Sequence, residues 1–175
     1  MIYTFKITTN EGPDFIRLIE IDADSTFWVL HTLIQQDIGF GSDQMASFFV
    51  VDERWSKHIE VTQIDMGSNG IPRYTMRRTK IRDLIKTKGQ KLLYIFDFFN
   101  DRSFYIELTE ISMEKTLNEP QVAYKRGKAP KQVFTEDVEM INTPERFLDS
   151  YHDYGDLDDY TEIFGEMDDL MERGN

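Results

Sequence analysis

Two aspartates and a histidine are the residues of this chain whose types and positions together could carry catalysis. In the aromatic-rich stretch 92–111, Asp97 stands before the break at Asn100–Ser103 and Asp101 stands within it, and His31 lies much earlier in the sequence. Paired carboxylates with a base nearby are typical of hydrolytic acid and base chemistry. One hypothesis is therefore an enzyme of unassigned hydrolytic type, in which folding brings His31 close to Asp97 and Asp101.

Asp97 also has a structural interpretation. On a period of two residues it stands where a strand leaves the core and enters the turn Asn100–Ser103. An aspartate in that place commonly accepts backbone N–H bonds and fixes the turn. A catalytic aspartate needs a partner group, a raised pKa and a cleft, and the sequence indicates none of these. We therefore treat Asp97, Phe98, Asp101 and His31 as candidates either for function or for organising this turn, and we favour the second.

Motifs for other chemistries are missing from the sequence. There is no cysteine, which excludes disulfides and thiolate zinc sites, and the three histidines, His31, His58 and His152, are scattered. No HExxH motif, EF-hand loop, Walker lysine, glycine fingerprint or GxSxG motif occurs. We expect no cofactor and no metal site, and this pattern favours a protein that is not an enzyme.

Charge divides the chain into two parts. Residues 136–175 contain fourteen acidic and two basic residues, which accounts for the whole net charge of −12. Segment 71–91 carries eight basic residues and one acidic residue. The candidate basic patch within it is Arg73, Arg77, Arg78, Lys80 and Arg82. Phosphate neutralisation by such residues would suit a nucleic acid, but the acidic chain would repel one, so we expect these bases to pair with the acidic tail.

Length and hydropathy indicate one domain in the cytoplasm. A chain of 175 residues can bury a core of ordinary size. The first ten residues alternate between apolar and polar types, unlike a signal peptide, and the longest apolar runs are far too short to span a bilayer. We expect a core domain over residues 1–135 and an acidic helical extension over residues 136–175 that packs on it.

Apolar spacing predicts an α+β fold. The expected elements are strands at 3–8 and 15–21, a helix at 27–38, a strand at 45–52, a hairpin around Asn69–Gly70, a short helix at 79–85, and strands at 91–98 and 103–112. Residues 118–134 are expected to be mostly loop. This order is that of a β-grasp domain, the ubiquitin-like arrangement in which a mixed sheet wraps one helix, with an inserted hairpin, an added strand and C-terminal helices.

Several short patterns together resemble one family. Members carry a tyrosine, an aspartate–phenylalanine pair and a second aspartate, matched here by Tyr94, Asp97, Phe98 and Asp101, and then a strand matched by Ile106–Leu108. Upstream, Leu30 and His31 fall on a leucine–histidine pair within a helix; downstream, GKAP at 127–130 stands at a family loop, and ERFL resembles the helix after it. Over residues 1–150 the chain thus resembles the Ri-plasmid open-reading-frame-three-like proteins, found on plasmids and as passengers of insertion elements.

The departures from this family point away from catalysis. Where the family has glycine, tryptophan and histidine after the aspartate, this chain has Phe99, Arg102 and Phe104. A histidine–leucine pair after the first helix is replaced by Gln44 and Met45, and the cysteines and acids of the family loop are gone. The resemblance therefore implies a fold more firmly than an activity, and a member with few polar groups left for a reaction.

The leading hypothesis is a protein-interaction or adaptor module. Residues 157–171 place apolar side chains on one face of a predicted helix and acids on the other. That apolar face either packs on its own domain or engages a protein partner, and an exposed sheet face is the other candidate surface. The hydrolase and the nucleic-acid binder are kept as alternatives.

Overall fold

The strands and helices are described from a computed structural model over residues 1–67 and 73–134. Residues 1–132 make up one unit with its own core. The helices expected after residue 135, including the acidic helix at 157–171, lie outside the described residues. Within the described residues, no helix is long and apolar enough to cross a membrane.

The first three elements follow the apolar periodicity. Strands β1 (Ile2–Thr8) and β2 (Ile16–Asp22) pair as an antiparallel hairpin and bury alternate residues. Helix α1 (Phe27–Ile38) buries Phe27, Leu30, His31 and Ile34, which are spaced to share one face. The helix ends at Gly39, whose φ of 72° lies in the left-handed region that glycine adopts without strain.

The remaining elements complete a single sheet of eight strands. They are β3 (Ser47–Val51), β4 (Lys57–Thr62), β5 (Tyr74–Thr75), α2 (Ile81–Leu84), β6 (Lys91–Asp97), β7 (Arg102–Ser112) and β8 (Gln121–Arg126). The strand order is β5-β4-β3-β6-β7-β1-β2-β8. The predicted α+β class is confirmed at the level of a mixed fold with a large sheet and few helices. The added strand β7 lies between β1 and β6, so the β-grasp details stay a prediction.

The expected hairpin around Asn69–Gly70 is wrong. Strands β4 and β5 are parallel neighbours, with Val61 opposite Tyr74 and Thr62 opposite Thr75. Two strands joined by a tight turn must run antiparallel, whereas parallel strands need a longer connection that returns the chain to the starting end. Residues 63–73 make that connection, and the Asn69–Gly70 pair itself lies outside the described residues.

Strand β8 was not expected, because residues 118–134 were predicted to be mostly loop. It pairs antiparallel with β2, with a bulge between Leu18 and Ile19. Of its six residues only Val122 is partly buried, and the others are exposed. A strand that buries so little shows no alternation of apolar and polar residues, so the sequence pattern does not predict it. Its position is set by its pairing with β2.

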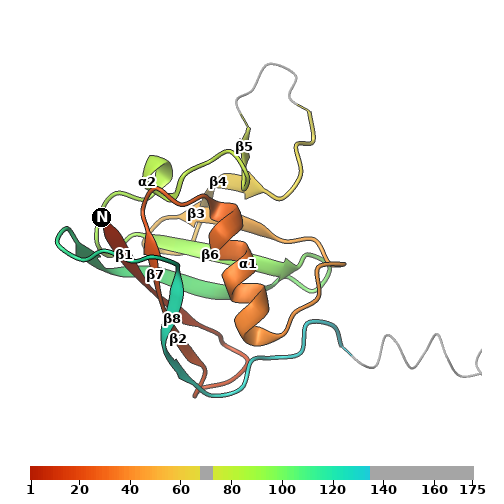
Figure 1. Cartoon of the computed structure of the whole chain (residues 1–175). Coiled ribbons are helices and arrows are strands. Elements are labelled where there is room, and N and C mark those ends of the chain that lie inside the picture. The colour runs from red at the N-terminus through yellow and green to blue at the C-terminus, as the bar shows by residue number, and fades with distance from the viewer. Residues whose placement is uncertain (68–72, 135–175) are drawn as a thin grey trace, which may run out of the picture. The chain divides into compact units, whose positions relative to one another are not determined.

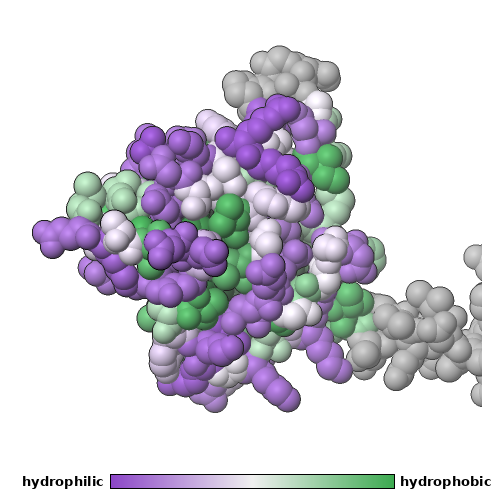
Figure 2. Space-filling model, viewed as in Figure 1, coloured by the Kyte–Doolittle hydropathy of each residue, from purple (hydrophilic) through white to green (hydrophobic). Residues whose placement is uncertain are grey.

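The core lies between one face of the sheet and α1, which crosses that face (Figure 1). Aromatic side chains fill much of it: the rings of Phe48 and Tyr94 are 4.9 Å apart, and those of Phe96 and Phe104 are also 4.9 Å apart. On the side that shows α1, the surface is largely hydrophilic with scattered apolar spots (Figure 2).

Candidate functional site

Asp97 ends β6 and shapes the turn into β7. Its Oδ1 accepts the backbone N–H of Asn100 at 3.1 Å, and its Oδ2 accepts the Asn100 side-chain amide at 2.9 Å. The Arg102 guanidinium lies 3.5 Å from the same Oδ2. Partial burial raises the pKa of Asp97, but the hydrogen bonds from Asn100 and Arg102 outweigh it and hold the pKa below its ordinary value. This carboxylate is therefore ionised at neutral pH and engaged in its own turn.

The other residues of the turn face the solvent. Asp101 has a φ of 50°, uncommon for a residue with a side chain, and pairs loosely with Lys57 at 3.5 Å. Phe98 is 49% exposed and Phe99 is 96% exposed. We name Phe98 and Phe99 the aromatic tip. Two adjacent phenylalanines in water at the end of a hairpin form the most apolar feature of this turn.

Arg102 ties three loops together at this end of the sheet. It is buried, and its side chain donates to Glu11 at 2.9 Å and to the backbone carbonyl oxygens of Lys131 at 2.6 Å and Gln132 at 3.1 Å. The guanidinium also lies 4.8 Å from the centre of the Phe96 ring. The hairpin that carries the aromatic tip is thus fixed at its base to the turn after β1 and to the segment after β8.

His31 lies in the core and not in a catalytic site with Asp97. It is 1% exposed, its Nδ1 is 2.8 Å from the Tyr94 hydroxyl, and its ring centre is 5.1 Å from that of Trp28. Burial, with the positive charge of Arg77 nearby, lowers the pKa of His31 to about 4. Among residues 1–67 and 73–134, no hydrogen bond or ion pair joins His31 to Asp97 or Asp101. The proposed triad is therefore not assembled in the described part of the chain.

The basic segment pairs with acids of its own unit. Lys80 and Arg82 each lie 3.1 Å from Asp24. Arg78 lies 3.5 Å from Asp65, Arg77 stacks 3.7 Å from the centre of the Trp28 ring, and Arg73 is exposed. Four of the five candidate bases are thus engaged by described residues, while the expected pairing with the acidic tail stays a prediction. An interface with a nucleic acid would have to compete with these contacts.

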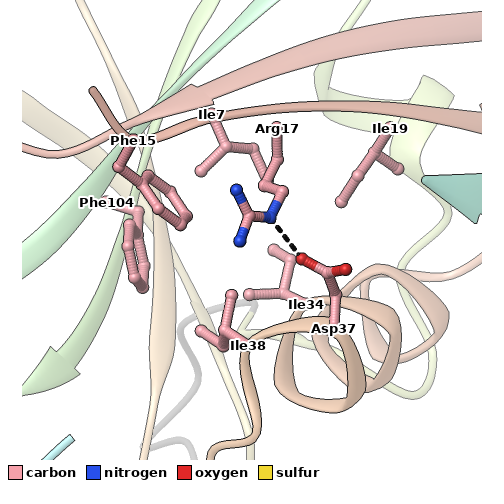
Figure 3. Close-up of a pocket in the computed structure, with 8 residues that line it drawn as sticks. All are labelled: Ile7, Phe15, Arg17, Ile19, Ile34, Asp37, Ile38 and Phe104. Carbon is pink, nitrogen blue, oxygen red and sulfur yellow. Dashed lines mark hydrogen bonds and ion pairs between the residues drawn. The ribbon is translucent and has the colours of Figure 1, made fainter. Parts of the chain in front are cut away.

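The cavity beneath α1 is a small gap in the packing around the Arg17–Asp37 ion pair and not a substrate pocket. It has a volume of about 10 Å³, which is room for about one water molecule. Figure 3 shows the guanidinium of Arg17, from β2, pointing at the Asp37 carboxylate of α1 among apolar side chains; Nε and Oδ2 are 2.5 Å apart. The apolar lining is Ile7, Phe15, Ile19, Ile34, Ile38 and Phe104. Such a volume excludes an organic substrate.

Arg17 also holds the edge strand. Its Nη1 donates to the carbonyl oxygens of Ile16 and Arg126, at 2.9 and 2.8 Å, and its Nη2 to that of Gly127 at 3.2 Å. Sequence reasoning missed this residue. The sequence offers one indication. In the alternating pattern of β2, Arg17 occupies a position that faces the core, and the other residues at such positions are apolar. A buried arginine at such a position needs a buried acid, which here is Asp37.

Neither aspartate of the turn lines the cavity beneath α1 or a second hollow near β3 and β6. The second hollow, of about 360 Å³, lies between the turn after β3 and the loop before β6, and it is lined by residues 51–53 and 87–91. No group of three His, Cys, Asp or Glu side chains that could hold a metal ion occurs among the described residues. The arrangement around Asp97 fixes the turn and presents the aromatic tip.

The comparisons with known proteins agree with the resemblance in the sequence. The model of the plasmid pRiA4b ORF-3-like proteins matches residues 1–171. A crystal structure of a protein of unknown function, MM3350 from Methanosarcina mazei Go1, is 20% identical, covers 89% of this chain and 90% of its own, and superposes with a TM-score of 0.59. At that identity the likeness shows the fold alone. No curated protein sequence matches the chain.

Proposed function

The chain belongs to the plasmid pRiA4b ORF-3-like family, and we propose that it is a non-enzymatic interaction module that engages a protein partner through the aromatic tip. The observation that carries this proposal is the exposure of Phe99, which is 96% exposed in the turn at the end of the β6–β7 hairpin. Aromatic side chains dominate the binding energy of protein interfaces because they bury large areas in the partner's pockets. The partner that suits the tip is a protein with an apolar pocket wide enough for a phenyl ring.

The rigidity of the turn supports the proposal. Asp97 accepts two hydrogen bonds from Asn100, and Arg102 anchors the start of β7 to Glu11. A loop that is already ordered loses little conformational entropy when it binds, so more of the contact energy appears as affinity. A flexible loop with the same two phenylalanines would bind more weakly.

Three finer features belong to this proposal. The acidic segment 157–171 supplies a second contact with the partner, the protein acts in the cytoplasm, and the order of strands and helix is β-grasp-like. The first rests on the amphipathic pattern and the charge of the C-terminal forty residues. The third rests on the succession strand, strand, helix, strand at the start of the chain.

Affinity purification with matched baits tests the proposal. The baits are the wild type, Phe98→Ser/Phe99→Ser, Met113→Ser, and a chain that ends before Asp156. Met113 is 75% exposed directly after the end of β7 and controls for the loss of an exposed apolar side chain elsewhere. Partners recovered by the wild type should be confirmed with purified proteins by titration calorimetry.

The double phenylalanine variant should bind a confirmed partner at least roughly thirtyfold more weakly, which corresponds to about 2 kcal/mol for an aromatic hot spot. Met113→Ser should bind as the wild type does. All full-length variants should melt within a few degrees of one another, because the replaced side chains are already exposed. Equal binding by the double variant would refute the tip as the contact, and loss of binding in the shortened chain alone would assign it to the acidic segment.

A further inference from the structure

The outer edge of β8 is open for backbone pairing. In the sheet order β8 is the last strand, and it lies beside β2 at one end of the sheet (Figure 1). On its other side no strand pairs with it in the part of the chain that the structure describes. An edge strand presents a row of backbone N–H and C=O groups, which can receive one further strand.

This edge is shaped before a ligand arrives. Arg17 donates to the carbonyl oxygens of Arg126 and Gly127, and its ion pair with Asp37 fixes the guanidinium. Gly127 has a φ of 75°, and a Cβ at this position would lie 2.5 Å from the Asp14 carbonyl oxygen. The path of the chain at the end of β8 is therefore set by its neighbours, and binding requires little further ordering.

Charge selects what can pair with this edge. Residues 121–132 contain four basic residues and no acidic one: Lys125, Arg126, Lys128 and Lys131. The side chain of Lys125 is 69% exposed, and the acid paired with it, Asp37 at 3.8 Å, is already bound to Arg17. Like charges on neighbouring strands destabilise their pairing, and opposite charges stabilise it. A second copy of β8 is thus disfavoured, and an acidic strand is favoured.

We propose that the outer edge of β8 binds an acidic, extended segment of another protein, which adds to the sheet as a ninth strand. The backbone of that segment pairs with β8, and acidic side chains of the segment lie beside Lys125 on one face of the sheet and beside Arg126 on the other. Tyr124, which is exposed, adds an aromatic contact on the same strand. This binding does not involve the aromatic tip, so the two surfaces can be tested separately.

Basic residues on an edge strand have a second known role, which is to prevent aggregation. That role requires charge alone. Strand addition requires charge of the right sign and, in addition, free N–H groups on the ligand. A test must therefore change the charge and the backbone separately.

The test uses the full chain and a fluorescent probe peptide, Thr-Glu-Glu-Val-Glu-Glu-Val-Thr, which carries glutamates on both faces of an extended strand. Binding is followed by anisotropy at about 0.15 M salt, where charges beyond about 8 Å are screened. The wild type should bind this peptide, and Lys125→Glu/Arg126→Glu should bind it roughly tenfold more weakly or worse. A matched peptide with lysine in place of glutamate should show the reverse preference and bind the doubly substituted protein better. That gain also shows that the variant is folded.

Two controls separate strand addition from simple attraction. Lys86→Glu/Lys88→Glu changes the net charge equally at exposed residues of the loop before β6, and it should bind the acidic peptide as the wild type does. The acidic peptide with successive N-methylated residues keeps its charge but cannot donate backbone hydrogen bonds, and it should not bind.

Three results would overturn the proposal. The first is equal binding of the acidic peptide to the wild type and to Lys125→Glu/Arg126→Glu, and the second is equal binding of the methylated and unmethylated peptides. The third is no binding to the wild type, including the case in which a second copy or the chain's own acidic segment already covers the edge.

Discussion

Lowering the pH should destabilise the protein, because folding buries the imidazole of His31 in its neutral form. The imidazole is 1% exposed and shares a hydrogen bond with the Tyr94 hydroxyl at 2.8 Å. Burial, together with the charge of Arg77, lowers the pKa of His31 to about 4, and burial raises the pKa of Tyr94. Both groups are therefore neutral in the folded protein at neutral pH.

The size of the effect follows from the two pKa values. In the unfolded chain His31 returns to its ordinary value of 6.5, against about 4 when folded. At about 1.4 kcal/mol per pH unit, this difference corresponds to about 3 kcal/mol. Because the folded value is the lower one, the unfolded chain takes up the proton first as the pH falls. The contribution to stability is complete above about pH 6.5 and is lost progressively down to about pH 4, with about 2 kcal/mol already lost at pH 5.

Urea denaturation at pH 7 and pH 5 measures this loss. The variant His31→Gln keeps a polar group near Tyr94 but cannot titrate, and His58→Gln replaces an exposed histidine of β4 as the control. Carboxylates that titrate in this range are present in all three proteins, so their effect cancels in the comparison. The wild type and His58→Gln should lose about 2 kcal/mol more than His31→Gln between the two pH values. Parallel losses in all three proteins would refute the assignment of a buried neutral imidazole.

Two substitutions test the other polar contacts. Arg17→Met should lower the free energy of unfolding by about 3–5 kcal/mol, because it leaves the buried Asp37 carboxylate without its main partner. The double variant Arg17→Met/Asp37→Leu should recover much of this loss, because it removes the unpaired charge as well. A double variant that is no more stable than Arg17→Met would contradict this account. Asp97→Ala should lower the same quantity by about 1–2 kcal/mol, because the two hydrogen bonds from Asn100 are lost. A variant of Asp97 with full stability in urea but without a hydrolytic turnover that the wild type shows would instead favour the enzyme hypothesis.

The sequence predicts those parts of the fold that depend on apolar periodicity. The helix ending at Gly39 and the strand that contains Tyr3 repeat apolar residues at the period of their element, and the strands that contain Phe48 and Tyr94 are short continuous apolar runs. The prediction of an antiparallel hairpin after β4 is wrong because the turn dipeptide Asn69–Gly70 indicates only a local reversal of the chain. It does not indicate whether the next strand, β5, pairs with β4 in the parallel or the antiparallel direction. Strand β8 was missed because its stability comes from pairing with β2 and from Arg17, and neither leaves an apolar pattern in residues 121–126.

Contacts between distant residues lie beyond such reasoning. His31 meets Tyr94 from 63 residues away, and Arg102 meets Glu11 from 91 residues away. Each residue alone is ambiguous, since a histidine on a helix can be a ligand, a base or a buried neighbour of a tyrosine. The role is decided only when the fold places Tyr94 of β6 next to His31 of α1. Buried polar residues therefore need the fold before their chemistry can be assigned.

Two positions at which this chain departs from the family pattern given by the resemblance are consistent with the proposed binding surface. Phe104 stands where the resemblance has a histidine, and it is fully buried with its ring 5.2 Å from Phe15 and 4.9 Å from Phe96. An apolar ring there stabilises the core and supplies no base. Phe99 replaces a glycine and projects into solvent, where it adds nothing to the core. One replacement removes a polar group from the interior, and the other adds an apolar group to the surface. Our proposal therefore rests on the second of these positions, the exposed ring of Phe99, and the first explains why Phe104 belongs to the core instead.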